Sequence, residues 1–160
     1  MSSQVLSEQT VLAAWARLLR AHAGTTRELS AQLQADHGLT INDYEALLHL
    51  SQAENGALRR IDLASELVLT PSGVTRLLDG LEKAGYVRKG PCSTDARVTY
   101  AVLTDAGREK LHESSCAHVA AVMELFGQRF SDDELVTLAE LLGRLPGAAG
   151  DGSECTPGAA

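Results

Sequence analysis

Aromatic residues, long apolar runs and secretion signals are scarce or absent in this chain of 160 residues, and each absence excludes a class of protein. Aromatic residues make up only 4% of the sequence, so any core must consist mostly of Leu, Val and Ala. No apolar run approaches the ~18 residues that a membrane-spanning helix needs. The polar start MSSQVLSEQT lacks the basic and apolar regions of a secretion signal. These features predict a cytoplasmic protein without a membrane partner.

Cysteine frameworks and enzyme motifs are also missing. Cys92, Cys116 and Cys155 are an odd number at wide spacing, so a disulfide framework is not expected. The sequence contains no GxSxG, Walker, HExxH or CxxC motif, and the paired acids Asp132 and Asp133 are explained by helix capping. The sequence therefore predicts a protein that is not an enzyme and needs no cofactor.

The charge is unevenly distributed along the chain, whose net charge is -7. Residues 59–110 contain nine Lys and Arg against seven Asp and Glu, a balance of +2, whereas the rest carries -9. The middle third therefore differs electrically from its flanks, as a nucleic-acid-binding segment would. A solvated charged face has the same composition, so this asymmetry alone does not decide the function.

Apolar side chains at helical spacing predict that most of the chain is helical. The segments with this pattern are residues 7–35, 40–51, 59–66, 70–84, 104–126 and 131–145. Gly38 is the expected C-cap of the first helix, and Thr70 with Pro71 is a strong helix start. In the third segment, the residues expected to face inward are Ile61, Leu63 and Ala64.

The pattern changes after Gly85 and predicts a β-hairpin. Residues 86–89 can form a short strand, residues 90–95 have turn chemistry, and residues 97–102 alternate and are rich in β-branched side chains. The predicted fold class is therefore mainly α with a small β-wing, a winged helix-turn-helix.

The predicted organisation is a single domain over residues 1–146. A DNA-binding lobe spans about 40–103, and dimerisation helices span about 7–36 and 104–146. Residues 147–160 are mostly Gly, Ala, Pro, Ser and acid, which predicts a disordered tail.

The helix from Thr70 has the two faces that a major-groove helix needs, one apolar and one with short polar side chains. Thr70 and Ser72 can donate to phosphates or bases, and Arg76 can pair with guanine or phosphate. An ordinary amphipathic helix explains the periodicity equally well, but the following hairpin favours a winged helix, whose wing projects arginine over the minor groove. The candidate DNA-binding residues are Thr70, Pro71, Ser72, Thr75, Arg76, Arg88, Lys89 and Arg97.

Residues 63–107, LASELVLTPSGVTRLLDGLEKAGYVRKGPCSTDARVTYAVLTDAG, resemble the MarR (multiple antibiotic resistance regulator) family of bacterial repressors. The resemblance rests on a VTRLLDGLEKAGYV recognition helix, a D-x-R wing tip and an LT-x-x-G exit. The residues that match the last two parts are Asp95, Arg97, Leu103, Thr104 and Gly107. The resemblance implies that Arg97 enters the minor groove and that Asp95, a further DNA-site residue, holds the wing by an ion pair. Cys92 departs from the charged or polar residues that the family often carries there.

The function implied by this resemblance is a sequence-specific regulator of transcription that binds double-stranded DNA. It is expected to be a homodimeric repressor that binds a pseudo-palindromic operator and is released by a small-molecule effector. The apolar stripes at both ends of the chain support the dimer independently, because pairing with a second chain would bury them. A two-fold axis would place the recognition helices about one DNA turn (~34–36 Å) apart.

Two sets of residues are candidates for sensing a signal. Arginine beside aromatic groups suits a planar anion, and the residues of this kind are Trp15, Arg17, Arg20, His22 and Tyr44. The same residues can equally be dimer core and surface charges. Zinc sensing is known in the family, and the weak candidates for metal ligands are His112, Glu113, Cys116 and His118, although the His-rich run of zinc sensors is absent.

Two further alternatives are a redox sensor and a winged helix that binds only proteins. The peroxide-sensing members of the family use a cysteine in the first helix, and this chain has none there. The outward set of Ser72, Thr75, Arg76 and Arg97 favours DNA over a protein partner.

Overall fold

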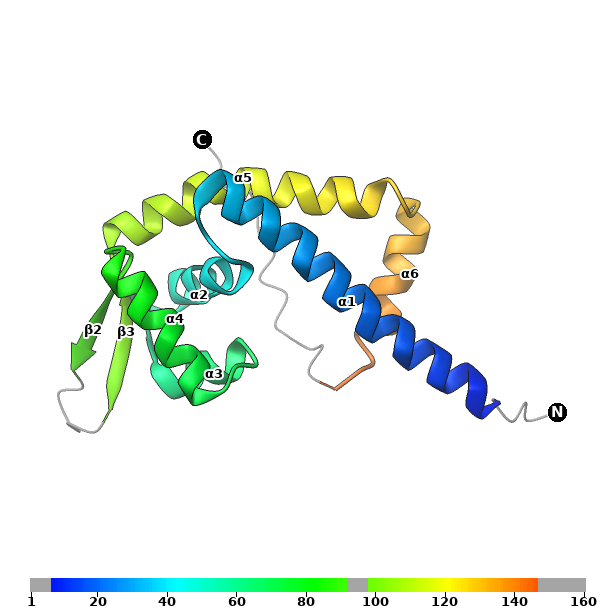
Figure 1. Ribbon diagram of the computed structural model, residues 1–160, viewed down its shortest axis with the longest axis horizontal. Helices are drawn as coiled ribbons and strands as arrows, with labels where there is room; N and C mark the ends of the chain where they lie inside the picture. The colour runs from blue at the N-terminus through cyan, green and yellow to red at the C-terminus, as the bar shows by residue number, and fades with distance from the viewer. Residues whose placement is uncertain (1–6, 92–97, 147–160) are drawn as a thin grey trace. The chain divides into compact units, whose positions relative to one another are not determined.

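The computed structural model describes residues 7–91 and 98–146, which form helices and one small sheet (Figure 1). The predicted wing-tip residues Cys92, Asp95 and Arg97, and the predicted tail, lie outside the described residues. The chain falls into two compact units that divide between Ile41 and Asn42. No helix in the described ranges is long and apolar enough to cross a membrane.

The first unit is the long helix α1 (Glu8–His37). The Ser7 hydroxyl accepts a hydrogen bond from the Thr10 amide at 3.3 Å and caps its start. Gly38 adopts a left-handed conformation (φ 68°) and its amide donates to the Gln34 carbonyl at 3.1 Å. The predicted glycine C-cap is therefore confirmed, because only a residue without a Cβ adopts this conformation at little cost.

The second unit contains the remaining elements. In chain order they are α2 (Ile41–Gln52), the 3-10 helix η1 (Glu54–Gly56), β1 (Ala57–Arg59), α3 (Arg60–Glu66), α4 (Pro71–Lys83), β2 (Val87–Pro91), β3 (Thr99–Leu103), α5 (Asp105–Gly127) and α6 (Asp132–Leu142). This mainly helical order with a small wing confirms the predicted winged-helix fold class.

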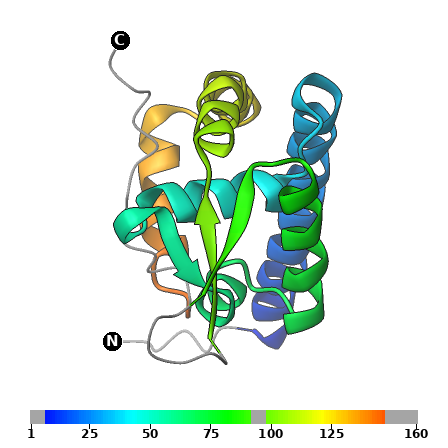
Figure 2. The same ribbon diagram turned by 90° about the vertical axis from the view of Figure 1, so that its left-hand side faces the viewer.

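The sheet is antiparallel and has the order β1-β3-β2, with α4 beside β2 (Figure 2). Lys89 pairs with Ala101, and Arg88 pairs with Val102. Residues paired across strands share a face, so Val87, Lys89 and Ala101 lie on one face of the sheet. Val87 and Ala101 are buried there. The sequence pattern did not reveal β1, because three residues are too few to show alternation.

The core of the second unit is built mainly of leucine, as the scarcity of aromatic residues predicts. Fully buried members include Leu47 and Leu50 of α2 and Leu63 of α3. The prediction that Ile61 faces inward is wrong, because its side chain is 72% exposed. Leu63, Ala64 and Leu67 cover the inward side of the short helix α3, and a residue two positions before Leu63 points to a different side.

Candidate nucleic-acid interface

Helix α4 separates its apolar and polar side chains as a recognition helix requires. The Thr70 hydroxyl accepts from the Gly73 amide at 3.1 Å, and Pro71 occupies the first helical turn. The buried residues of the helix are Val74, Leu78 and Leu81. The predicted contact residues Thr70, Pro71, Ser72, Thr75 and Arg76 are all exposed. The structure therefore brings these five predicted residues onto the accessible side of a single helix.

The start of α4 favours an anion. Its first turn contains no acidic residue, whereas the first turn of α6 contains Asp132, Asp133 and Glu134. Backbone amides at a helix N-terminus carry partial positive charge and bind phosphate oxygens. The hydroxyls of Thr70 and Ser72, 3.2 Å apart, lie at the same end. This end of α4 therefore has the chemistry of a phosphate contact.

The turn between α3 and α4 contains a strained residue. Val68 has φ 52°, and its side chain is 90% exposed. A β-branched residue rarely adopts the left-handed conformation, because its Cβ crowds the backbone. The Leu69 amide donates to the Ala64 carbonyl at 3.0 Å and closes the turn. The tight connection that presents α4 is thus formed in spite of a local conformational cost.

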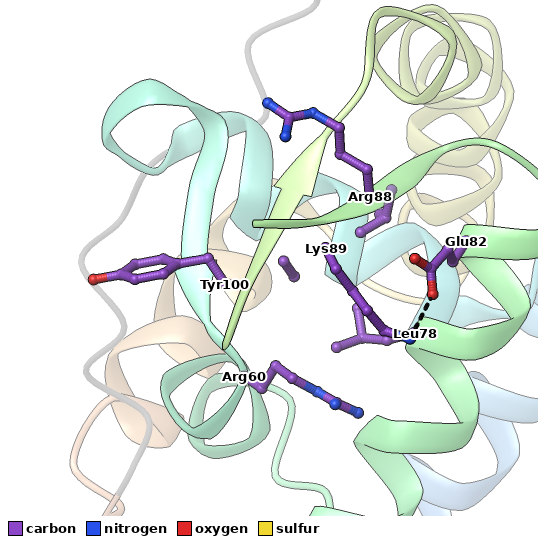
Figure 3. A pocket seen from close by; sticks show the side chains of 8 residues that line it. Arg60, Leu78, Glu82, Arg88, Lys89 and Tyr100 are labelled. Atoms are coloured by element: carbon purple, nitrogen blue, oxygen red, sulfur yellow. Dashed lines mark ion pairs between the residues drawn. The ribbon is translucent and has the colours of Figure 1, made fainter. Parts of the chain in front are cut away.

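The two cations of β2 point to different sides (Figure 3). Lys89 faces α4, where its Nζ lies 3.0 Å from Oε2 of Glu82. Arg88 is exposed and lies on the other face of the strand. A strand turns successive side chains to opposite faces, so adjacent residues cannot serve the same surface. Lys89 therefore ties the wing to α4, and Arg88 is directed away from that helix.

Arg60, on α3, belongs to this region although it was not among the predicted contact residues. Its Nη2 donates to Oγ1 of Thr75 at 3.0 Å. Arg60 and Thr75 are fifteen positions apart, so helical periodicity gives no signal of this contact. In the sequence, Arg60 stood out only as one of the basic residues of the middle third.

The LT-x-x-G exit joins the wing to α5. Thr104 Oγ1 donates to the Gly85 carbonyl at 2.6 Å and accepts from the Gly107 amide at 3.0 Å. The Thr104 amide donates to the Tyr86 carbonyl at 3.1 Å. A Cβ at Gly107 would lie 2.1 Å from the same carbonyl oxygen, so only glycine permits this approach. The motif therefore fixes the start of α5 against the chain segment that leads into β2.

The candidate effector residues are divided between the two units. On α1, the side chains of Trp15, Arg17, Arg20 and His22 are exposed. Tyr44 lies in the second unit and is 2% exposed. Its hydroxyl donates to Ser115 Oγ at 3.3 Å, and its ring centroid lies 4.5 Å from that of His118. The proposed effector pocket stays a prediction.

The weak metal candidates all lie on α5. No group of three or more His, Cys, Asp or Glu side chains in the described ranges is placed to hold a metal ion. Burial lowers the pKa of His118, and its Nδ1 is buried without a hydrogen-bond partner. Cys116 is exposed and is not in a disulfide. The arrangement gives no support to a zinc site built from His112, Glu113, Cys116 and His118.

Comparisons with known proteins agree with this geometry. Residues 37–98 match the model of the MarR family. The chain is similar to AbsC, a MarR family transcriptional regulator from Streptomyces coelicolor, with 32% identity and a TM-score of 0.75 over 88% of this chain and 93% of AbsC. It is also similar to Sco3205, a MarR family regulator of the same organism in complex with DNA, with 30% identity and a TM-score of 0.76 over 88% of this chain and 87% of Sco3205. The HTH-type transcriptional repressor YetL of Bacillus subtilis is 31% identical over 114 residues, which cover 69% of this chain and 66% of YetL.

Proposed function

This chain belongs to the MarR family of DNA-binding transcription regulators, and we propose that it is a homodimeric repressor that binds a pseudo-palindromic operator through α4 and the wing. The observation that carries the proposal is the exposed, hydroxyl-rich face of α4, which starts without an acidic residue. The name of YetL, a transcriptional repressor, supports repression as the proposed effect on transcription. The complex of Sco3205 with DNA supports DNA as the binding partner.

The proposed contacts divide into attachment and reading. Thr70 and Ser72, with the Ser72 amide, hold phosphates, whereas Thr75 and Arg76 face base edges in the major groove. Arg97 enters the minor groove, and Asp95 holds it there. Arg88 offers a further cation to the backbone of the DNA. Lys89 contributes indirectly, because its ammonium is paired with Glu82 and keeps the wing beside α4.

The dimer is proposed from apolar surface that each unit leaves uncovered. On α1, the exposed large apolar residues are Val11, Leu12, Trp15 and Leu19. On α6 and just after it, they are Val136, Leu141, Leu142 and Leu145. Soluble monomers rarely expose so many large apolar side chains close together. In this proposal, helices 7–36 and 104–146 join two copies, and the lobe of about 40–103 binds DNA within one domain of residues 1–146.

Sedimentation tests the dimer. At micromolar concentration we expect about twice the chain mass of 17.0 kDa, with or without residues 147–160. A monomer with full helical content would contradict the two-fold arrangement.

Binding-site selection from randomised duplexes tests the DNA proposal. The parent protein should enrich one half-site sequence, and Arg76→Ala should change the enriched bases. Arg27→Ala is the matched control, because Arg27 is an exposed arginine on α1 outside every candidate set. If the parent enriches no sequence, or if Arg76→Ala enriches the same sequence as the parent, the proposed role of α4 is wrong.

The effector proposal is a planar carboxylate bound near Arg17 and Arg20. Benzoate serves as the probe, and it can release the protein from DNA only if it prefers the conformer with misplaced recognition helices. Arg17→Ala and Arg20→Ala should weaken the release and leave DNA binding unchanged. A normal response in both variants would remove these residues from the pocket.

A further inference from the structure

Arg60 and Thr75 form a contact between the two helices of the helix-turn-helix. Arg60 is the first residue of α3, and its side chain extends toward α4 (Figure 3). Its Nη2 donates to Thr75 Oγ1 at 3.0 Å. Arg60 is half-buried and Thr75 is exposed, so the contact lies on the accessible side of α4.

The hydroxyl of Thr75 both donates and accepts a hydrogen bond within the protein. Its single proton is donated to the Pro71 carbonyl at 2.9 Å, and one of its lone pairs accepts from Arg60. A hydroxyl has one donor and two acceptor sites. In this arrangement Thr75 has no proton left for a base, and what remains for recognition is its methyl group and one lone pair.

Arg60 borders a narrow trough beside the sheet. The trough is lined by Arg60 together with Leu78, Glu82, Val87, Arg88, Lys89, Tyr100 and Ala101. The free cavity there is only about 10 Å³, close to the room of one water molecule. Glu82, the acid that lines this trough, is paired with Lys89. The Arg60 side chain thus borders a trough with little free space, and its guanidinium reaches Thr75.

We propose that Arg60 is a positioning residue for sequence recognition, which fixes the Thr75 side chain so that its methyl group reads the 5-methyl group of a thymine. Apolar contact is the way in which a threonine methyl group distinguishes thymine in the major groove. The inference rests on the proposed insertion of α4 into that groove. It adds to that proposal the base that is read, which is thymine, the group that contacts it, which is the Thr75 methyl group, and the residue that positions this group, which is Arg60.

Replacing thymine by deoxyuridine tests this directly, because the exchange removes only the 5-methyl group. The half-site enriched by the parent protein is synthesised with each thymine exchanged in turn. We expect one thymine per half-site at which the exchange weakens parent binding about four-fold, the value of one buried methyl group at roughly 0.8 kcal/mol. Thr75→Ser keeps the hydroxyl and both of its bonds but lacks the methyl group, so it should bind both duplexes equally.

Arg60→Ala should also reduce the preference for thymine over uracil, although its Thr75 keeps the methyl group, because the Thr75 side chain is then held only by its bond to the Pro71 carbonyl. The double variant Arg60→Ala/Thr75→Ser should behave as Thr75→Ser alone, because both changes remove the same contact. Arg59→Ala is the matched control, since the Arg59 guanidinium binds Asp62 within α3 and not α4. Each variant is its own reference between the two duplexes, so a loss of stability cannot imitate the result.

Three results would overturn the inference: no thymine with a methyl effect in the parent, a full methyl effect in Thr75→Ser, or a full methyl effect in Arg60→Ala. An Arg60→Ala variant that instead weakens binding to selected and scrambled duplex equally, with a smaller salt dependence, would identify Arg60 as a phosphate contact. The proposed function fails separately, when the parent protein enriches no sequence at all.

Discussion

Gly107→Ala is expected to destabilise the protein strongly, although it adds only one methyl group. The added Cβ would lie 2.1 Å from the Tyr86 carbonyl oxygen and 2.8 Å from Leu103 Cδ1. Real Cβ atoms do not approach an oxygen within 3.0 Å, so α5 must move away from the segment before β2. The closest atom belongs to the backbone, so a change of side-chain rotamer cannot relieve the contact.

The size of the loss follows from two contributions. Inserting a methyl group into a packed site costs about 1–3 kcal/mol. Moving α5 also weakens the hydrogen bond from the Thr104 amide to the Tyr86 carbonyl, which contributes about 1 kcal/mol. We therefore expect the free energy of unfolding to fall by about 2–4 kcal/mol, and the melting temperature by roughly 10 °C.

Urea unfolding followed by circular dichroism measures this loss, with all variants at one protein concentration because the stability of the proposed dimer would depend on it. Gly80→Ala is the control, since a Cβ at Gly80 within α4 meets no atom within 4 Å. Alanine favours a helix interior over glycine by about 0.5–1 kcal/mol, so this variant should be more stable than the parent. If Gly107→Ala is as stable as the parent, the close approach of α5 to Tyr86 is wrong.

Three other changes have expected outcomes that the same unfolding assay checks. Val68→Gly should stabilise the protein by about 1 kcal/mol, because it relieves a left-handed conformation and removes no buried contact; a loss would contradict the strain at φ 52°. Thr70→Ala should cost about 1 kcal/mol by removing the cap on the Gly73 amide, whereas Ser72→Ala, whose hydroxyl lies 3.2 Å from that of Thr70 and caps no amide among the described residues, should cost less. Burial lowers the pKa of His118 below its unfolded value near 6.5, so the unfolded chain binds the proton first and stability falls as the pH drops through that value. His118→Gln should show a shallower loss of stability between pH 7 and pH 5, and an unchanged slope would contradict the burial of this imidazole.

The sequence predicted the helices well because their ends are determined locally. A cap residue bonds to an amide three positions ahead, as Thr70 does with Gly73 and Thr104 with Gly107. The helix capping that explained Asp132 and Asp133 is present for the same reason, as a capping box from Ser131 to Glu134 at the start of α6. Signals of this kind depend on neighbouring residues alone, so a single sequence is sufficient to read them.

Features that depend on distant residues were not predictable in the same way. Strand β1 exists because Leu58 pairs with Ala101, more than forty positions further along the chain. The contact from Arg60 to Thr75 depends on the angle at which the α3–α4 turn presents the two helices. Ile61 shows the opposite error, since it was assigned to the core although the sequence of so short a helix shows too little periodicity to identify its inward side.

The alternation of the wing strand decides how its cations can act. The sequence offered Arg88 and Lys89 together as DNA contacts, but adjacent strand residues serve opposite faces. Lys89 lies on the α4 side, where its pairing with Glu82 is that of two partly exposed groups, worth at most about 1 kcal/mol. Such a pair adds little stability, but it holds β2 at a defined place beside α4. In the proposed complex, a wing positioned in this way places Arg97 in the minor groove while α4 occupies the major groove.

Glu82→Gln should therefore weaken operator binding, because the wing is no longer held beside α4. The bases selected by α4 should stay unchanged. Operator affinity, measured beside binding-site selection for Glu82→Gln and Lys89→Met, separates the two roles, because a direct phosphate contact by Lys89 would make only the lysine variant lose affinity.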